Sequence, residues 1–380
     1  MQQTTITTLE RMRTLNNFQG LGSPTLIGSM PQTDRERAIG LVLRSVPQIP
    51  AWPQLPAYPA EQMMAQYIEG LPGLVTEEGS QLVRSDTPEF DRQVLLFYEQ
   101  YLALDAPAEP PLLVDNSPFR MGTETGATFR RFFEVLASAP PPALRALKGQ
   151  IVGPFTLLAG LKDQEGRALI YDDRFLDIVP RLLGLKARWQ IETMRAMGVP
   201  VIIFLDEPGL AGFGSSAFIT ITAELVLMLL TEVVQAVHAA GGIAGIHVCA
   251  NTDWVLAFRS NVDIVNFDSY GYFDKFALYR KEWLEFMAGG GIMAWGAVPT
   301  LDIEAIRAET AQSLADRWTG QVRRLAAGGM NVEQVMAQSL FTPSCGCGSL
   351  SEDDAAQVLE LLGGFCRIVL TNARCGTRFF

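Results

Sequence analysis

Eight short apolar runs, most of them stopping abruptly at or next to glycine, proline, serine or an acidic residue, set the strongest constraint on how this chain folds. Short continuous runs rich in valine, isoleucine and phenylalanine are typical of strands buried on both faces of a parallel sheet. The predicted strands are Thr25–Gly28, Ala51–Gln54, Gln150–Val152, Val201–Leu205, Gly242–Val248, Asp263–Phe267, Gly291–Trp295 and Gln338–Phe341.

Helical patterns lie between most of these runs. The predicted helices are Asp34–Ser45, Leu176–Met197, Ala223–Ala240, Glu304–Ala327 and Asp353–Ile368. Strands that alternate with helices join through right-handed crossovers into a parallel sheet, and eight such units close into a barrel. The sequence therefore predicts an α/β fold, a single (β/α)8 TIM barrel. A hydrophobic content of 48% supplies the core, and 380 residues fit one barrel with insertions.

The segment Ala57–Leu147 interrupts this pattern between the second and third predicted strands. It holds a hairpin pattern at Gly73–Val83, a helical pattern at Asp91–Leu104 and a proline-rich exit. We expect residues 1–380 to form one TIM-barrel catalytic domain, with 57–147 as an insertion near the barrel mouth. A small separate lobe is the alternative for the insertion.

Charge and hydropathy exclude several classes of partner. The formal net charge is −11 and no lysine or arginine cluster occurs, which argues against nucleic acid or an anionic membrane. No run of about 18 uncharged apolar residues occurs, so no membrane span is expected. The segment Met1–Asn17 has no apolar signal region, and five cysteines are too few for a disulfide framework. We expect a cytoplasmic protein whose thiols are free to bind metal or react.

Polar groups gather where the predicted strands end. In a TIM barrel the active site forms at the carboxyl ends of the strands. The residues at those ends that carry chemistry are Ser29, Asp206, Glu207, His247, Cys249, Asp268 and Cys345.

The most specific of these features is the pair His247 and Cys249. Side chains two residues apart on a strand point to the same face, so both would face the barrel interior. An imidazole nitrogen beside a thiolate suits zinc, although a core histidine and an inert cysteine are the simpler explanation for this motif alone. The chain has only two histidines, and one of them stands at this strand end.

A second cysteine group, Cys345 and Cys347, follows the eighth predicted strand. One histidine and two cysteines from two strand ends give three protein ligands and leave a fourth position for substrate, as in catalytic zinc sites. We therefore predict metal ligation by His247, Cys249 and Cys345, with Cys347 as the alternative to Cys345. Incidental thiols in a glycine-rich turn are the competing explanation.

The acidic residues at the strand ends have several open roles. Asp268 could be a fourth zinc ligand, a hydrogen-bond acceptor for His247, or a substrate contact. Asp206 and Glu207 could bind a substrate ammonium group, or they could cap the helix that follows.

Four of these segments resemble motifs of cobalamin-independent methionine synthase. Ile27–Thr33 resembles its opening barrel motif, and Leu205–Leu210 resembles its DEPAL segment. His247–Cys249 and Pro343–Gly346 resemble its H-x-C and P-D-C-G zinc motifs, and all four occur in the family's order over most of the chain. The superfamily also includes uroporphyrinogen decarboxylases and zinc-dependent methylcobamide:thiol methyltransferases. The stretch Ala250–Asp253 looks more like the latter and like short "core" methionine synthases.

The resemblance implies a zinc ion at His247, Cys249 and Cys345. It places Asp268 where the family has a glutamate ligand that is one methylene longer. It also places Ser29 and Asp206 where the family holds the amino-acid end of homocysteine.

Two departures from the family concern the methyl donor. The chain has no room for the additional N-terminal barrel that helps the full-length enzyme bind folate. The family's general-acid histidine also has no counterpart, because the matching stretch reads Gly296–Thr300. Demethylation of a folate needs protonation of a poorly leaving nitrogen, whereas a methylcobamide leaves without that proton. We therefore expect a methylcobamide donor, with a corrinoid protein as the candidate partner.

These expectations describe a zinc-dependent methyltransferase that converts homocysteine to methionine. Three alternatives stay open: a methylcobamide:coenzyme M type methyltransferase, a metal-free lyase similar to uroporphyrinogen decarboxylase, and a non-catalytic module that binds thiols or a corrinoid protein.

Overall fold

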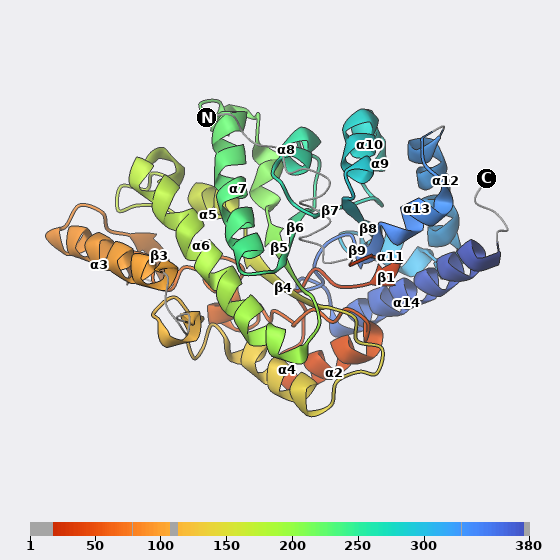
Figure 1. Cartoon of the computed structure of the whole chain (residues 1–380), viewed down its shortest axis with the longest axis horizontal. Coiled ribbons are helices and arrows are strands. Elements are labelled where there is room, and N and C mark those ends of the chain that lie inside the picture. Colours follow the sequence, from red (N-terminus) through yellow and green to blue (C-terminus); the bar gives the residue numbers. More distant parts are fainter. Residues whose placement is uncertain (1–17, 78, 107–112, 328, 376–380) are drawn as a thin grey trace.

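The computed structural model describes residues 18–77, 79–106, 113–327 and 329–375 (Figure 1). The segment 1–17, on which the expected absence of an export signal rests, lies outside the described residues. No helix within the described ranges is both long enough and apolar enough to cross a membrane.

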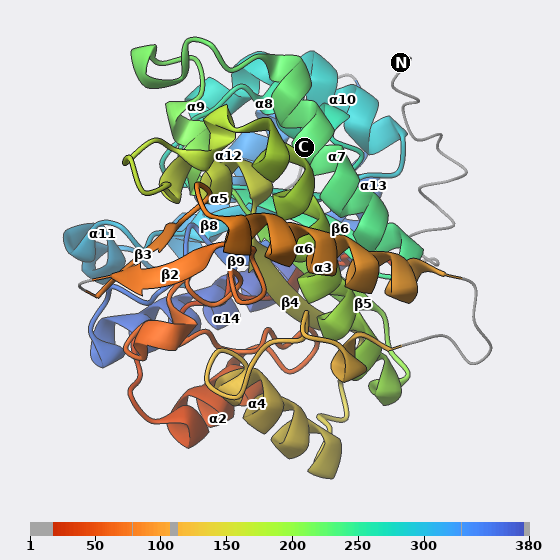
Figure 2. The same ribbon diagram turned by 90° about the vertical axis from the view of Figure 1, so that its left-hand side faces the viewer.

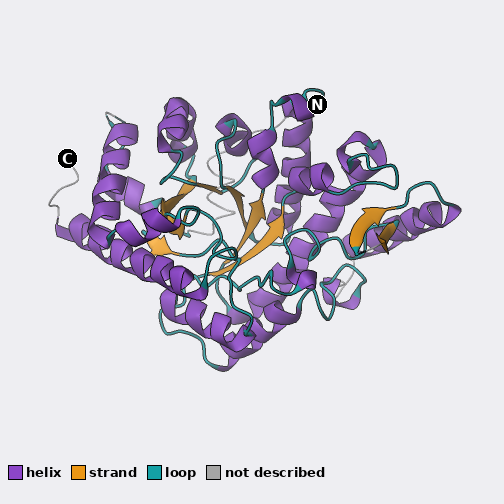
Figure 3. Cartoon of the chain, turned by 180° about the vertical axis from the view of Figure 1, so that it is seen from behind, coloured by secondary structure: helices purple, strands orange, loops and turns teal. Residues whose placement is uncertain are grey.

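Seven parallel strands within the described residues form one curled sheet in the order β1-β9-β8-β7-β6-β5-β4 (Figure 3). Because neighbours in this order follow one another in the chain from β4 to β9, each connection crosses over through helical segments. The strands are β1 (Ser23–Pro24), β4 (Leu147–Val152), β5 (Val201–Asp206), β6 (Ile243–Val248), β7 (Ile264–Phe267), β8 (Ile292–Val298) and β9 (Ser339–Pro343).

The α/β fold is confirmed, but a closed barrel of eight strands is not. The predicted second strand, Ala51–Gln54, is present only as isolated parallel bridges from Ala51 to Lys148 of β4 and from Gln54 to Ser29. Proline has no backbone N–H to donate to a ladder, and Pro53 stands inside this segment. The segment therefore spans the gap between the two edges of the sheet without forming a regular strand.

Two faces of the sheet carry different side chains. On β5, Ile203 and Leu205 belong to the large core shared with the helices, whereas Ile202 and Phe204 belong to a second, smaller apolar cluster. Successive strand residues point to opposite faces, so the smaller cluster fills the concave face. Asp206 continues the alternation of Ile202 and Phe204. The concave face is therefore apolar at the amino ends of the strands and polar at their carboxyl ends.

Helices cover the convex face of the sheet (Figure 1). The α-helices of the described residues are α2 (Arg35–Ser45), α3 (Pro88–Asp105), α4 (Ala127–Ser138), α5 (Pro154–Gly160), α6 (Asp173–Met194), α7 (Ala223–Ala239), α8 (Trp254–Arg259), α9 (Phe273–Phe276), α10 (Arg280–Ala288), α11 (Ile303–Ala308), α12 (Ala311–Ala326), α13 (Val332–Ala337) and α14 (Glu352–Cys375). Helix α3 lies to one side, beside the hairpin of the inserted segment (Figure 1).

The predicted helix Glu304–Ala327 is in fact two helices, α11 and α12. The chain leaves the helical conformation at Glu309, and Thr310 then starts α12 with a reciprocal capping box formed with Ser313. A capping box satisfies N–H groups that the first turn of a helix leaves free, so it favours a new start at this point.

The segment 57–147 contains the predicted hairpin and helix. The hairpin is β2 (Leu74–Glu77) with β3 (Ser80–Val83), and it lies beside α3 in Figure 2. The segment packs on the rest of the chain. The ring of Phe129 in α4 meets that of Trp52 edge-on, with 5.6 Å between the ring centroids, and its centroid lies 4.7 Å from that of Trp189.

Candidate metal centre

Three side chains from two strand ends meet on the concave face. His247 is on β6, Cys249 follows that strand, and Cys345 follows β9. One ligand atom from each of the three lies within 4.8 Å of those of the other two. Strands β7 and β8 separate β6 from β9 in the sheet, so the curl of the sheet is what brings these residues together.

The imidazole of His247 is held by Asn266 on the neighbouring strand. Asn266 donates from Nδ2 to Ala294 O at 2.9 Å and to Thr342 Oγ1 at 2.8 Å, so its Oδ1 is the acceptor that faces His247 Nδ1. Nδ1 therefore carries a hydrogen, and Nε2 is the nitrogen left for a ligand. Among the described residues, this buried Nε2 has no hydrogen-bond partner. A metal ion fits that position.

A hydrogen bond between the two cysteine sulfur atoms shifts their pKa values in opposite directions. A hydrogen bond from Cys345 lowers the pKa of Cys249 to about 4, against the effect of burial and with help from His247. The same hydrogen bond, together with burial, raises the pKa of Cys345. Burial lowers the pKa of His247, but contact with Cys249 and the charge of Asp206 outweigh it and raise that pKa. A cation among these groups would displace the protons, as metal binding to cysteine and histidine does.

Asp268 lies near this group without belonging to it. Its carboxylate is buried and accepts a hydrogen bond from Gly271 N at 2.7 Å. Burial raises its pKa to about 6, and the charges of His247 and Cys249 also act on it. The carboxylate therefore faces its own loop, and direct metal ligation by Asp268 stays a prediction.

The glycine-rich loop places Cys345, and not Cys347, in the group. Cys347 is buried in the hydrophobic core, and burial raises its pKa to about 12. The backbone N–H of Cys347 donates to Ser29 O at 2.8 Å, and that of Gly348 donates to Ser29 Oγ at 3.4 Å. A Cβ at Gly346 would overlap Ser29 Oγ, so the loop lies directly against the Ser29 side chain.

The neighbouring acids Asp206 and Glu207 have different surroundings. Asp206 is buried at the end of β5, and its Oδ1 has no hydrogen-bond partner among the described residues. Burial raises its pKa to about 6, although the charges of His247 and Lys148 oppose this shift. Asp206 therefore keeps an unused acceptor close to His247.

Glu207 is engaged by the start of helix α5. Its two oxygens accept from Phe155 N at 2.9 Å, Thr156 N at 2.8 Å and Thr156 Oγ1 at 2.6 Å. Burial raises its pKa to about 7 in spite of these bonds. The carboxylate binds N–H groups that the first turn of a helix leaves free.

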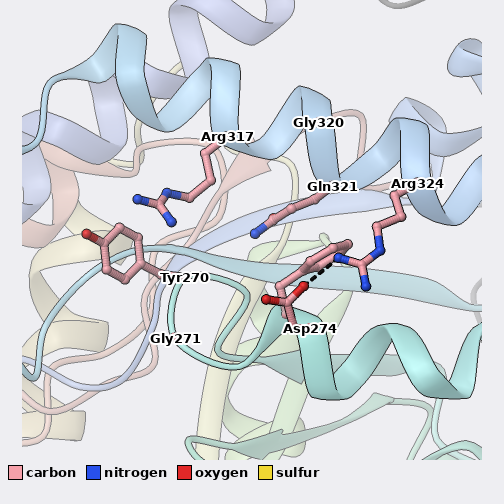
Figure 4. A pocket seen from close by; sticks show the side chains of 8 residues that line it. Tyr270, Gly271, Asp274, Arg317, Gly320, Gln321 and Arg324 are labelled. Carbon is pink, nitrogen blue, oxygen red and sulfur yellow. Dashed lines mark hydrogen bonds and ion pairs between the residues drawn. The ribbon is translucent and has the colours of Figure 1, made fainter.

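A cavity of about 270 Å³ lies between α12 and the loop that carries Tyr270 and Gly271 (Figure 4). Arg317, Gln321 and Arg324 of α12 form one wall, and Tyr270 lies on the other. Both arginines are already paired, Arg317 with Glu309 at 3.1 Å and Arg324 with Asp274. The cavity is separate from the three candidate ligands, none of which lines it.

Comparisons with known proteins identify the fold of this chain but do not assign it to a family. No protein-family model matches the sequence, and neither does any curated protein. The B12-independent methionine synthase from Shewanella sp. W3-18-1, solved in complex with selenomethionine, aligns with a TM-score of 0.54 and 16% identity. The alignment covers 93% of this chain and 99% of that one.

This chain has the fold of that synthase. A methyltransferase from Methanosarcina mazei also aligns, with a TM-score of 0.48 and 12% identity over 94% of this chain and 98% of that one. The resemblance that the sequence motifs predicted is thus confirmed at the level of the fold. At these identities the comparison does not identify substrate, donor or metal.

Asn266 is the residue of this site that the sequence did not reveal. Its amide sets the orientation of His247 because the two residues are direct partners in the parallel ladder of β6 and β7. Because side chains alternate along a strand, Asn266 lies on the same concave face as Ile264 and Asp268. Only the register between β6 and β7 shows that Asn266 contacts His247.

Proposed function

We propose that this chain is a zinc-dependent methyltransferase that transfers a methyl group to the thiol of homocysteine, giving methionine. The proposed donor is not a folate but a methylcobamide. The observation that carries the proposal is the convergence of His247, Cys249 and Cys345, whose ligand atoms lie within 4.8 Å of one another. Among the described residues, Nε2 of His247 has no hydrogen-bond partner.

The donor set selects the metal. One imidazole nitrogen and two thiolates suit zinc, a borderline-soft ion that takes four ligands in a tetrahedron. Three protein ligands leave the fourth position to a substrate. When bound, zinc supplies a Lewis acid that lowers the pKa of a thiol from its usual value of about 8.5, so that the thiolate is the nucleophile at neutral pH.

The neighbouring side chains would bind the amino-acid end of the substrate. Within the described part of the chain, one buried oxygen of Asp206 has no partner, and a substrate ammonium group would satisfy it with a charge-assisted hydrogen bond. Ser29 and the adjacent backbone N–H groups of its loop would hold the carboxylate. Asp268 would contact either the substrate or the metal.

Glu207 has a different role in this proposal. Both of its oxygens already accept hydrogen bonds from the start of α5. We assign it to positioning the end of β5, so that Asp206 faces the site, and not to contact with substrate.

The lack of a histidine acid favours the methylcobamide donor. The chain has two histidines, and the second, His238, lies at the end of α7. His238 Nε2 lies 2.8 Å from Asp263 Oδ2, just before β7 begins and so at the opposite end of the sheet from Cys249. No imidazole other than His247 is therefore at hand to protonate a folate nitrogen. A corrinoid protein would present the methylcobamide.

The same proposal includes the domain organisation. Residues 1–380 would act as one catalytic unit, with 57–147 as an insertion at the mouth. The shared packing of Phe129 with Trp52 and Trp189 supports this arrangement.

The decisive experiment combines metal analysis with a panel of thiols. Purified protein would be analysed for zinc, then assayed with methylcobalamin and either homocysteine or 2-mercaptoethanesulfonate, before and after chelation. We expect about one zinc per chain and methylation of homocysteine that chelation abolishes and zinc restores. Preference for 2-mercaptoethanesulfonate would show that this thiol, and not homocysteine, is the methyl acceptor. Zinc without any turnover would indicate a binding module, and full activity in metal-free protein would overturn the mechanism.

A further inference from the structure

A buried lysine lies on the concave face and has no part in the chemistry proposed above. Lys148 of β4 is fully buried, and its ladder partner is Ile202, which belongs to the apolar cluster of that face. Its Nζ lies 4.4 Å from the ring centroid of Phe204. The next side chain of β5 on the same face is Asp206. The ammonium group of Lys148 therefore lies below Asp206 on the inner wall of the sheet.

The side chain of Lys148 also crosses the gap in the sheet. Its Nζ donates to Ile27 O at 2.5 Å and to Gln150 Oε1 at 3.4 Å. Ile27 comes two residues before Ser29, on the far side of the irregular segment 51–54 that bridges to both edges. The lysine therefore places a positive charge next to the backbone that leads into Ser29.

A buried ammonium group is costly, and an apolar side chain would close this gap at less cost. Burial lowers the pKa of Lys148 to about 8, against the charge of Asp206, so the lysine is still a cation at pH 7. Asp206, whose pKa burial raises to about 6, is an anion at the same pH. The base of the candidate site therefore carries one charge of each sign.

We propose that Lys148 is a specificity-determining residue that selects thiols carrying a carboxylate, so that Lys148 and Asp206 together recognise the zwitterionic end of an amino acid. This role rests on the proposed function and gives the physical origin of its preference for homocysteine. The substrate carboxylate would lie at Ser29, on the side of the gap that Lys148 reaches. The ammonium group would lie at the Asp206 oxygen to which no described residue donates.

The charge of the whole chain makes such a local cation necessary. The formal net charge is −11, so the overall field does not attract a carboxylate to the site. A fixed cation in a buried position attracts an anion more strongly than it would in bulk water. Lys148 acts at a distance, because its Nζ is already engaged by Ile27 O and Gln150 Oε1.

Three thiols that differ at the amino-acid end test this role. Homocysteine carries both charges, 4-mercaptobutanoate lacks the ammonium group, and 3-mercaptopropylamine lacks the carboxylate. Each would be assayed with methylcobalamin and the zinc-loaded full chain. In Lys148→Met we expect KM for homocysteine and for 4-mercaptobutanoate to rise at least about 10-fold, with kcat within about 3-fold. KM for 3-mercaptopropylamine should stay the same or fall, because a repelling cation has been removed.

Two further variants separate charge from packing. Lys148→Gln keeps a donor for Ile27 O but removes the charge, so it should show the same selectivity as Lys148→Met. It also gives the readout if Lys148→Met does not fold. Lys186→Met is the matched control, because Lys186 of α6 is another buried lysine that donates to a backbone carbonyl. The control should leave all three KM values within about 2-fold.

The outcomes distinguish this role from the proposed function. An unmodified chain that methylates none of the three thiols would overturn the proposed function, and this role with it. If the unmodified chain prefers homocysteine and Lys148→Gln keeps that preference, the charge of Lys148 does not select the substrate. A similar rise in KM for all three thiols would show that Lys148 only supports the fold. Either of the last two results overturns this role alone.

Discussion

His247 Nδ1 and Asn266 Oδ1 face each other across two neighbouring parallel strands, and the two residues are direct partners in that ladder. Asn266 is itself fixed by hydrogen bonds to Ala294 and Thr342. The free nitrogen of His247 is therefore positioned by the sheet and not by a flexible loop. A site organised in this way is set for its ligand before the ligand arrives.

The first prediction concerns this positioning. Asn266→Ala removes the acceptor for Nδ1, so the imidazole can rotate or exchange its tautomer. We expect zinc affinity, measured by competition with a chromophoric chelator, to fall about 10–100-fold while the far-UV spectrum is unchanged. Thr342→Val is the control, because it removes one partner of Asn266 and leaves the contact with His247. Equal zinc affinity in Asn266→Ala and the unmodified chain would show that Asn266 does not position the ligand.

The second prediction separates the two cysteines of the glycine-rich loop. Cys345→Ser and Cys249→Ser should each lower bound zinc to well under half of one per chain after dialysis, because serine is a poor zinc ligand. Cys347→Ser should keep its zinc, since Cys347 is buried in the core away from the other ligands. Its cost should be in stability, about 1–2 kcal/mol for a buried hydroxyl. Zinc lost from Cys347→Ser, with Cys345→Ser unaffected, would reverse the assignment.

The third prediction contrasts Asp206 with Glu207. Asp206→Asn removes the proposed partner of the substrate ammonium, so homocysteine binding should weaken at least about 10-fold with little change in stability. Glu207→Gln places an NH2 group against the N–H donors of α5, so the free energy of unfolding should fall by about 2–4 kcal/mol. Titration calorimetry and urea unfolding of both variants measure the two quantities. The contrast fails if Glu207→Gln is as stable as the unmodified chain and binds homocysteine more weakly.

The sequence predicts much of this fold because buried strands and amphipathic helices have distinct periods. Strands β5, β6 and β7, which carry Asp206 and His247 and lead into Asp268, occur where the apolar runs predicted them. The prediction of a regular strand at 51–54 was wrong because an apolar run does not report on backbone hydrogen bonding. Pro53 has no backbone N–H to donate to a neighbouring strand. The start of a new helix at Thr310 could have been predicted from the sequence, since a threonine followed three residues later by a serine can form a capping box.

Only the part of the site that lies on a regular strand could be predicted from the sequence, because there side chains alternate between the two faces. His247 and Cys249 share a face by that rule. The choice between Cys345 and Cys347 lies in an irregular loop, whose backbone follows neither the strand nor the helix period, so alternation does not say which sulfur joins His247 and Cys249. The role of Asn266 depends on the register between β6 and β7, which is a property of three-dimensional pairing and not of either strand alone.

The last prediction concerns a lysine that the proposed chemistry does not use. Lys186 of α6 is buried, and its Nζ donates to Arg120 O at 3.0 Å. Burial lowers its pKa to about 8, against the charge of Glu69. Below pH 8 the lysine is charged in both the folded and the unfolded chain, so the full penalty of the buried charge is present. As pH rises from about 8 to about 10.5, the folded chain loses the proton first and the penalty is relieved.

Lys186→Met should therefore raise the free energy of unfolding at pH 7. The lowered pKa is worth about 3 kcal/mol at most, and the lost hydrogen bond to Arg120 offsets about 1 kcal/mol of it. The advantage of the variant should shrink steadily between pH 8 and pH 10, which urea unfolding of both proteins at each pH would measure. Lys281→Met is the control, because Lys281 is 82% exposed and should show no such pH-dependent difference. A constant difference across this range would mean that Lys186 titrates alike in the folded and unfolded chain.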